Sequence, residues 1–329
     1  MKIVTYTVET KLGPTKRLGI LLDPQTVFDP NLAWKSYYSS KGFYNTAQRA
    51  DHICPSSLFA ILNLKENPLE FLLESLSLKD SLDKKVQDLF TFKLTEALFL
   101  SCPLDKIATY RDFYTHEKHV AAGFKKRHEP IPKQWYQIPA YYKGATTGFI
   151  GNNETIPWPS YTNVLDYELE LAMVIGKEGK NISRENAIGH IFGFTVLNDI
   201  SARDIQKQEM AVRLGPAKGK DFCSILGPVI TTIDEFNFQE PNLLMSATIN
   251  GELWSKGQSA DSHFSWASMI EHVANDEWIR AGDLFGSGTV GTGCGLELDK
   301  WIKEGDTIDL FIEGIGHLKN TVGKKERRS

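Results

Sequence analysis

The sequence contains little cysteine and no long apolar run. Four of its 329 residues are cysteines, at positions 54, 102, 223 and 294, too far apart to form a CxxC pair. This spacing argues against a zinc ribbon or a dithiol redox motif, and it fits reduced thiols in the cytoplasm. No apolar segment approaches the roughly 18 residues of a membrane-spanning helix, and the N-terminus lacks the order of a signal peptide. We therefore expect a soluble cytoplasmic protein that makes no contact with a membrane.

Long blocks of one charge sign and internal repeats are also missing. The formal net charge is -4, and the basic residues are dispersed rather than gathered with aromatic residues. This distribution argues against a nucleic-acid partner. The hydrophobic share of 41% and charged share of 24% are typical of a globular protein. The length exceeds that of one typical domain, so we expect a main domain and a smaller accessory one.

The first hundred residues carry no motif that can be tied to chemistry. Alternating β-branched residues predict short strands from residue 1 to about 40, and a three- and four-residue apolar spacing predicts helices from 55 to about 89. A break at residues 101–103 precedes a predicted helix from 106 to about 126. We assign residues 1–102 to an accessory domain.

The remaining chain, residues 103–329, is predicted to form the catalytic domain. After residue 159 it becomes rich in strand patterns, and Asn250-Gly251 between two such patterns predicts a hairpin. Another strand is predicted over 307–312. Runs of strands with few helices indicate an α+β, β-rich fold rather than a βαβ array.

Three carboxylates form the first candidate site. The segment 166–176 has strand character, so Glu168 and Glu170 point the same way, roughly 7 Å apart. A second apolar strand, 191–197, ends beside Asp199. Carboxylate oxygens without a cysteine nearby in the sequence suit a hard cation such as Mg²⁺, Ca²⁺ or Mn²⁺. The alternative is a solvated edge strand with alternating glutamates.

Polar and basic residues follow this acidic group. Residues 201–204 resemble a capping sequence that opens a helix, on which Arg203 and Gln206 share one face. A glycine-bounded loop then ends at Lys220. Such groups beside a metal suit an anionic, oxygen-rich substrate. Taken alone, a loop such as the one ending at Lys220 is more often a simple turn.

Candidate acid–base residues lie upstream. On the helix predicted from residue 106, Asp112, His116 and His119 fall at i, i+4 and i+7, and therefore on one face. The two histidines are three residues apart, whereas a zincin motif needs them four apart. A surface or capping role is the alternative for either histidine, and a carboxylate on the same face favours a general base.

A GxGxxG string occurs at residues 286–291. No clear buried parallel strand is predicted before it and no helix with an apolar stripe after it, so we reject a dinucleotide site. Glycines at these positions would instead let the backbone and Thr289 approach a ligand closely.

Several of these segments together resemble the fumarylacetoacetate hydrolase family. They are RDFYTHEKHV (111–120), LDYELELAMVIGKEG (165–179), NDISARDIQ (198–206), LGPAKGKDF (214–222) and GSGT…LEL (286–298). The resemblance extends from about residue 107 to 323. It implies a mixed β-roll catalytic domain with a smaller N-terminal α/β accessory domain, a homodimer, and a bound Mg²⁺ or Ca²⁺.

The resemblance also implies roles for single residues. Asp112, Glu168, Glu170 and Asp199 would bind the metal. His119 would be the general base, oriented by Glu297. Gln206 and Lys220 match oxyanion contacts, Arg203 and Thr289 match substrate-carboxylate contacts, and Tyr142, or its neighbour Tyr141, matches a substrate tyrosine. The stretch 133–162 fits the family poorly, and the spacing from Gln206 to Lys220 is one residue longer than in the animal enzyme.

From these roles we expect a metal-dependent hydrolase acting on a small anionic oxo-acid. It would cleave a carbon–carbon bond in a 1,3-dioxo acid, of fumarylacetoacetate or acylpyruvate type, with water activated by His119 and Glu297. The first alternative is an oxo-acid decarboxylase, hydratase or isomerase of the same family, of 2-oxo-hept-3-ene-1,7-dioate or oxaloacetate type. The second is a non-catalytic, metal-stabilised binding protein.

Overall fold

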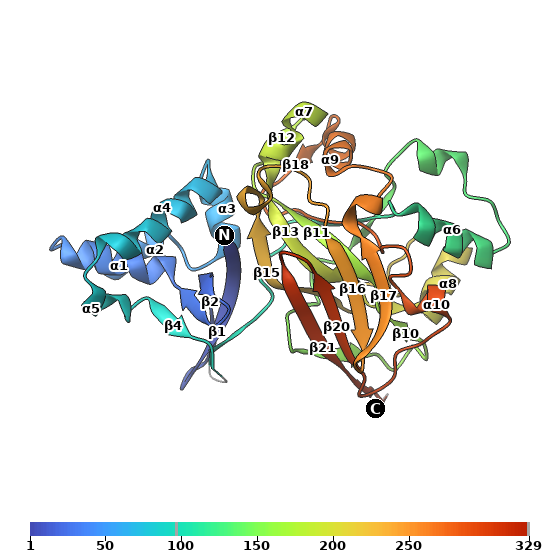
Figure 1. The fold of residues 1–329 in the computed structure, drawn as a ribbon, viewed down its shortest axis with the longest axis horizontal. Helices are drawn as coiled ribbons and strands as arrows, with labels where there is room; N and C mark the ends of the chain where they lie inside the picture. Colours follow the sequence, from blue (N-terminus) through green and yellow to red (C-terminus); the bar gives the residue numbers. More distant parts are fainter. Residues whose placement is uncertain (96–97, 328–329) are drawn as a thin grey trace.

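A computed structural model describes residues 1–95 and 98–327. Twelve strands in this part of the chain form one mixed sheet (Figure 1). Its order is β4 (Thr91–Lys93), β3 (Thr26–Phe28), β2 (Gly13–Asp23), β1 (Lys2–Thr10), β15 (Ser224–Thr232), β13 (Ile191–Asn198), β11 (Leu169–Ile175), β19 (Leu284–Gly286), β6 (Tyr110–Phe113) and β7 (Tyr141–Gly144), with β5 (Leu98–Leu100) beside β1 and β8 (Phe149–Ile150) beside β15.

A second sheet packs against one face of the first. Its order is β17 (Glu252–Gln258), β16 (Leu244–Ile249), β20 (Thr307–Ile312), β21 (Gly316–Lys325) and β9 (Thr155–Trp158). Alternate residues of β11, from Leu169 to Ile175, join β16 and β20 side chains in one buried core. The predicted Asn250-Gly251 turn joins β16 to β17, and the predicted strand 307–312 is β20.

Short strand pairs and helices complete the described chain. The pairs are β10 (Leu165–Asp166) with β14 (Ser201–Ala202), and β12 (Gly179–Lys180) with β18 (Trp278–Ile279). The helices are α1 (Pro30–Ser40), α2 (Thr46–Ile53), α3 (Leu58–Leu64), α4 (Pro68–Ser81), α5 (Lys84–Gln87), α6 (Glu117–Lys126), α7 (Arg184–Ala187), α8 (Arg203–Ala211), α9 (Trp266–Ala274) and α10 (Gly295–Leu298). No helix in the described ranges is long and apolar enough to cross a membrane.

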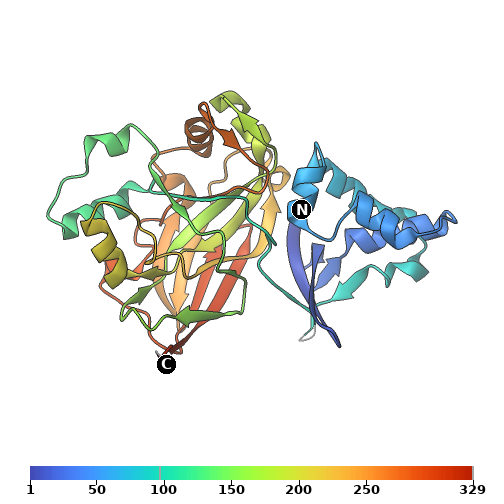
Figure 2. The ribbon, with the colours of Figure 1, turned by 180° about the vertical axis from the view of Figure 1, so that it is seen from behind.

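The N-terminal region lies beside the β-rich body and shares its large sheet (Figures 1 and 2). Strand β1 pairs with β15, where Ile3 lies opposite Ile230. Helices α1 to α4 supply a second buried core, to which Ala172 and Val174 of β11 also contribute from the opposite face of that strand. The large sheet therefore separates two hydrophobic cores.

Two predicted elements were wrong. Residues 30–40 form helix α1 rather than a strand, because Pro30 occupies the first turn and Asp29 accepts a hydrogen bond from the Leu32 backbone nitrogen at 2.8 Å. The predicted helix from residue 106 is instead strand β6 followed by helix α6, which begins only at Glu117. Asp112 is therefore on a strand and His119 on a helix.

Candidate active site

Four buried carboxylates from neighbouring strands of the large sheet converge on one point. Ligand oxygens of Asp112, Glu168, Glu170 and Asp199 all lie within 4.8 Å of one another. Asp112 comes from β6, Glu170 from β11 and Asp199 from the residue after β13, whereas Glu168 lies in the short break between β10 and β11. The predicted continuous strand 166–176 is thus interrupted, but Glu168 and Glu170 still face the same site.

The surroundings of these carboxylates fit a hard divalent cation. Asp112 Oδ1 is buried and has no hydrogen-bond partner among the described residues. Burial, followed by repulsion from Asp112, raises the pKa of Glu170 well above its usual value. Burial and then Asp199 raise the pKa of Asp112 in the same way. An oxygen-coordinated cation such as Mg²⁺, Ca²⁺ or Mn²⁺ would offset this repulsion.

A glycine makes room at the cluster. A Cβ atom on Gly286 would lie 2.5 Å from Asp112 Oδ1 and 3.0 Å from Glu170 Oε2. Two residues later, the Gly288 backbone nitrogen donates to Glu170 Oε2 at 3.1 Å, and the Thr289 hydroxyl lies 3.3 Å from Glu170 Oε1. The GxGxxG segment thus approaches the carboxylates, and its contact with a ligand stays a prediction. The strand before it, β19, is buried and parallel to β6, which the sequence pattern did not reveal.

Lys220 neutralises part of the cluster. Its ammonium group is 2.5 Å from Glu168 Oε2 and 2.5 Å from Asp199 Oδ2, and its side chain is only 3% exposed. Burial opposes its ionisation, but the two carboxylates raise the pKa of Lys220. Burial also opposes ionisation of Glu168, yet Lys220 and Arg203 together lower the pKa of Glu168 to about 2.

Tyr142 belongs to the cluster and Tyr141 does not. The Tyr142 hydroxyl donates to Asp199 Oδ2 at 2.7 Å, while the Ser224 hydroxyl donates to Asp199 Oδ1 at 3.1 Å. The Tyr141 ring packs against Phe113 instead. The structure therefore separates the two tyrosines that the sequence left as alternatives.

Arg203 is committed to protein groups. Its Nε and Nη2 donate to Asp166 Oδ2 at 2.8 and 2.7 Å, and its Nη1 lies 2.8 Å from Glu168 Oε1 and 2.9 Å from Gln206 Oε1. Arg203 and Gln206 thus share one face of α8, as predicted. Helix α8 begins after Ala202, which makes no side-chain cap, so the predicted capping sequence at Ser201 was wrong.

Asp166 was missed by the sequence reasoning. Besides Arg203, it accepts hydrogen bonds from the backbone nitrogens of Gly295 at 2.7 Å and Leu296 at 2.9 Å. It therefore joins Glu168, through Arg203, to the first turn of α10. The sequence did contain a signal for Asp166, because Asp166, Glu168 and Glu170 stand at every second position and share one face.

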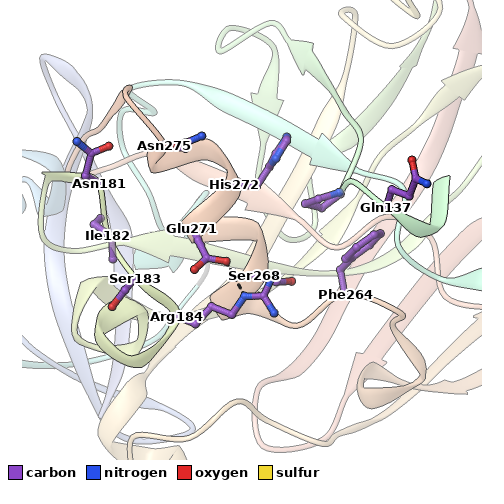
Figure 3. A pocket seen from close by; sticks show the side chains of 11 residues that line it. Gln137, Asn181, Ile182, Ser183, Arg184, Phe264, Ser268, Glu271, His272 and Asn275 are labelled. Carbon is purple, nitrogen blue, oxygen red and sulfur yellow. Dashed lines mark hydrogen bonds and ion pairs between the residues drawn. The ribbon is translucent and has the colours of Figure 1, made fainter. Parts of the chain in front are cut away.

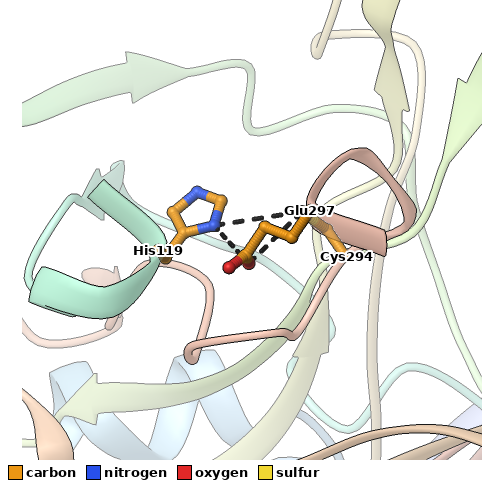
Figure 4. Close-up of side chains that lie close together, drawn as sticks. All are labelled: His119, Cys294 and Glu297. Carbon is orange, nitrogen blue, oxygen red and sulfur yellow. Dashed lines mark hydrogen bonds and ion pairs between the residues drawn. The ribbon is translucent and has the colours of Figure 1, made fainter. Parts of the chain in front are cut away.

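His119 and Glu297 form a pair beside the carboxylates. His119 Nδ1 is 2.7 Å from Glu297 Oε1, and the two side chains are 9% and 7% exposed. Figure 4 shows the other ring nitrogen turned away from Glu297. The backbone of Cys294 forms a bridge with that of Glu168, which places α10 next to the carboxylate cluster. This arrangement can take up a proton at His119 close to the carboxylate cluster.

The other predicted histidine is separate. His116 precedes α6, is 2% exposed, and has no hydrogen-bond partner for either ring nitrogen among the described residues. Burial, followed by the nearby His119, lowers the pKa of His116 to about 4. His116 is therefore a neutral, buried side chain.

A surface hollow of about 580 Å³ lies elsewhere, between α7, α9 and the segment around Gln137 (Figure 3). Arg184 and Glu271 form an ion pair of 2.6 Å in its wall. None of the predicted site residues lines it. The candidate chemistry is thus confined to the carboxylate cluster and its histidine.

The family profile described as fumarylacetoacetate (FAA) hydrolase C-terminal matches residues 108–323. The chain belongs to the fumarylacetoacetate hydrolase family. A solved fumarylacetoacetate hydrolase from psychrophilic Exiguobacterium antarcticum has a TM-score of 0.68 and 23% identity, covering 98% of this chain and 99% of that one. This likeness confirms the predicted β-rich family fold, including the N-terminal region.

Two curated relatives are oxaloacetate tautomerases by name. YisK of Bacillus subtilis is 42% identical over 164 residues, which make up 49% of this chain and 53% of that protein. The mitochondrial fahd2 of Xenopus laevis is 31% identical over 194 residues, or 59% of each protein. The match thus spans little more than half the length of these two relatives.

Proposed function

We propose that this family member is a metal-dependent tautomerase or isomerase of a small dicarboxylic oxo-acid of oxaloacetate type. The observation that carries the proposal is the 2.7 Å pairing of His119 with Glu297 beside four converging carboxylates. The names of the Bacillus and Xenopus relatives support the substrate class. This was the alternative in the sequence reading, and the comparisons favour it over carbon–carbon hydrolysis.

Asp112, Glu168, Glu170 and Asp199 would hold the divalent cation, Mg²⁺, Mn²⁺ or Ca²⁺. Five buried carboxylates, counting Asp166, face the two cations Lys220 and Arg203, which leaves a formal charge of three negative units. A bound divalent ion would supply positive charge that offsets the charge developing on substrate oxygen atoms. The donor set contains only oxygen atoms, as hard cations prefer.

His119 is the group that moves the proton. Glu297 orients its ring through Nδ1, so Nε2 is the nitrogen that takes a proton from the carbon beside the ketone. The electron pair of that C–H bond forms the carbon–carbon double bond, the ketone oxygen takes a proton from solvent, and the protonated His119 releases its proton to solvent, so all substrate atoms are conserved. Base assistance of this kind contributes ~10²–10⁴ in rate.

The remaining polar side chains would stabilise the charge that develops on the substrate or hold other groups of the site in position. Lys220 can donate a hydrogen bond to the oxygen on which negative charge develops. Thr289 and Tyr142 offer hydroxyl groups at the same cluster. We assign Arg203 and Gln206 to holding Glu168 and α8, because the guanidinium is already bonded to Asp166, Glu168 and Gln206. The earlier assignment of Arg203 to a substrate carboxylate is therefore replaced by a supporting one.

Hydrolysis of a 1,3-dioxo acid is the second candidate. The same His119–Glu297 pair could activate a water molecule, which would attack a carbonyl and lead to carbon–carbon cleavage. The two reactions differ in mass balance. Tautomerisation leaves the substrate mass unchanged, hydrolysis gives two smaller acids, and decarboxylation gives carbon dioxide.

The deciding experiment follows product mass as well as enol absorbance. The purified protein with Mg²⁺ or Mn²⁺ is given oxaloacetate, acylpyruvates, fumarylacetoacetate and fumarylpyruvate, and each reaction is compared with its spontaneous rate. Faster interconversion of the oxaloacetate tautomers without cleavage supports the proposal. Cleavage of an acylpyruvate with no effect on oxaloacetate would instead establish the hydrolase.

His119 and the metal are tested separately. His119→Ala should lower turnover by ~10²–10⁴ while metal content stays unchanged, and His317→Ala, at an exposed histidine, is the matched control. EDTA should abolish turnover and Mg²⁺ or Mn²⁺ should restore it. A protein that binds the metal but accelerates none of these reactions would be the binding protein considered above.

A further inference from the structure

Three side chains of different chemistry meet at α10. His119 Nδ1, Cys294 Sγ and a Glu297 carboxylate oxygen all lie within 4.8 Å of one another (Figure 4). His119 comes from α6, whereas Cys294 and Glu297 flank the first turn of α10. Nitrogen, sulfur and oxygen ligands in one group are typical of Zn²⁺ and related borderline ions, not of Mg²⁺ or Ca²⁺.

Two of the three separations between the ligand atoms are close to those of a tetrahedral site. Bond lengths of about 2.3 Å to sulfur and about 2.0–2.2 Å to nitrogen and oxygen give ligand–ligand edges of roughly 3.4–3.6 Å. Cys294 Sγ lies 3.6 Å from Glu297 Oε1 and 3.9 Å from His119 Nδ1. The remaining edge, from His119 Nδ1 to Glu297 Oε1, is 2.7 Å, and needs to open by less than about 1 Å.

The three side chains are also held in place. The Thr292 backbone nitrogen donates to Glu297 Oε2 at 3.0 Å, which leaves Oε1 facing His119 and Cys294. The His119 ring packs edge-on against Tyr114, with ring centroids 5.5 Å apart. Cys294 is 0% exposed and its backbone is bridged to Glu168. Ligands that are already oriented lose little freedom when an ion binds.

We propose that His119, Cys294 and Glu297 form a second metal site, selective for thiophilic divalent ions such as Zn²⁺, whose occupation takes His119 out of catalysis. On binding, the Cys294 thiol releases its proton to solvent and its sulfur bonds the ion. The His119 ring changes tautomer: the proton that Nδ1 shares with Glu297 in the proposed catalytic form moves through solvent to Nε2, and Nδ1 offers its lone pair to the ion. No electron transfer is involved. The inhibitory part rests on the proposed function, whereas the binding part does not.

The binding test uses Co²⁺ as a spectroscopic probe in the presence of saturating Mg²⁺, which fills the carboxylate cluster. The wild-type protein should bind one further Co²⁺ with tetrahedral d–d bands and a thiolate-to-cobalt charge-transfer band. Cys294→Ala and Cys294→Ser should lose both features. Cys54→Ala is the matched control, because Cys54 is also a buried free cysteine but lies among the N-terminal helices. Unchanged spectra in the Cys294 variants would overturn the site.

X-ray absorption at the zinc edge provides a test that needs no variant. Wild-type protein loaded with one equivalent of Zn²⁺ and excess Mg²⁺ should show one sulfur neighbour at about 2.3 Å. A shell of oxygen and nitrogen alone would place the ion elsewhere and reject the site. The outcome of both measurements does not depend on whether the protein turns over any oxo-acid.

Inhibition is measured once a substrate is known. Zn²⁺ added with saturating Mg²⁺ should inhibit the wild type, and the Cys294→Ala variant should need at least tenfold more Zn²⁺ for the same fractional loss. If the wild type and Cys294→Ala lose activity at the same Zn²⁺ concentration, the bound ion does not take His119 out of catalysis.

Discussion

The Asp166 carboxylate receives two hydrogen bonds from the Arg203 guanidinium, at 2.8 Å from Nε and 2.7 Å from Nη2. Both side chains are buried, and the same carboxylate holds the first turn of α10 through two backbone nitrogens. One acidic residue therefore fixes the position of Glu168, through Arg203, and of the helix that carries Glu297. Four predictions follow from this and neighbouring contacts.

Replacing Asp166 by Ala should destabilise the protein strongly. The change leaves the Arg203 guanidinium buried without its main partner, a situation that costs about 3–5 kcal/mol. Urea unfolding measures the loss. Glu271→Ala removes a pair with Arg184 whose side chains are 63% and 40% exposed, and should cost less than about 1 kcal/mol. Similar losses in the two variants would contradict the bridging role of Asp166.

A single methyl group at Gly286 should weaken metal binding. Its Cβ would lie 2.5 Å from Asp112 Oδ1, so this carboxylate must move out of the cluster. We expect Gly286→Ala to lower the affinity for Mn²⁺, measured by isothermal titration calorimetry, at least tenfold. Gly189→Ala is the control, since a Cβ there meets no atom within 4 Å. If Gly286→Ala binds Mn²⁺ as tightly as the wild type does, Asp112 is not a ligand.

Neutralising one carboxylate should raise the melting temperature in the absence of metal and remove the stabilisation that metal gives the wild type. Burial and then Asp112 raise the pKa of Glu170, because four carboxylates compete for one small space. Glu170→Gln should therefore raise the melting temperature in EDTA and abolish the further rise that Mg²⁺ gives the wild type. For the wild type, ligand at 100 times its Kd adds about 2.7 kcal/mol. Glu66→Gln, at an exposed position, should change neither the melting temperature in EDTA nor its rise with Mg²⁺.

His116 should make stability fall in mild acid. Its pKa is lowered from 6.5 to about 4 by burial, then by His119, while Asp261 and Glu297 act in the opposite direction and Lys118 adds to the lowering. Because the folded-state pKa is depressed, the unfolded chain binds the proton first, and stability is lost as the pH falls from about 6.5 to about 4. A shift of this size corresponds to at most about 3 kcal/mol.

The His116→Gln variant isolates that contribution from that of Asp112 and Glu170, whose raised pKa values act with the opposite sign. The difference in unfolding free energy between wild type and variant should decline by up to about 3 kcal/mol between pH 7 and pH 4. A difference that does not depend on pH would mean that the pKa of His116 is the same in the folded and unfolded protein.

The periodicity of apolar residues predicted most of the β-rich body. It failed where the structure depends on pairing between strands that are far apart in the sequence. Strand β20 and the Asn250-Gly251 turn agree with the local pattern. Strand β6 does not, because its residues are buried between β19 and β7, and neither neighbour is visible in a local window. The Asp112–His116–His119 spacing suggested a helix that starts too early. The division at residues 102 and 103 and the homodimer stay predictions.

Part of the candidate site could be predicted from local sequence, because Asp166, Glu168 and Glu170 alternate along one segment, whereas Asp112 and Asp199 come from other elements. The sequence could not show that Arg203 is bonded to Asp166, since that depends on how β10 and β14 pair. Nor could it place Cys294 beside His119, which is 175 positions away. The spacing of the cysteines predicted reduced thiols without a zinc-ribbon or redox motif, and only the packing of α6 against α10 brings one of them next to His119.

The position of strand β19 also bears on when the site can form during synthesis. In the chain β19 follows β6 and β11, but in the sheet it lies between them, with Gly286 paired to both Asp112 and Ala172. In the folded sheet Asp112 is joined to β11 only through β19, so we expect the four carboxylates to converge after residues 284–286 have left the ribosome. A nascent chain of some 280 residues would then carry every proposed metal ligand and still bind the ion weakly, with the cluster completed in one of the last steps of folding.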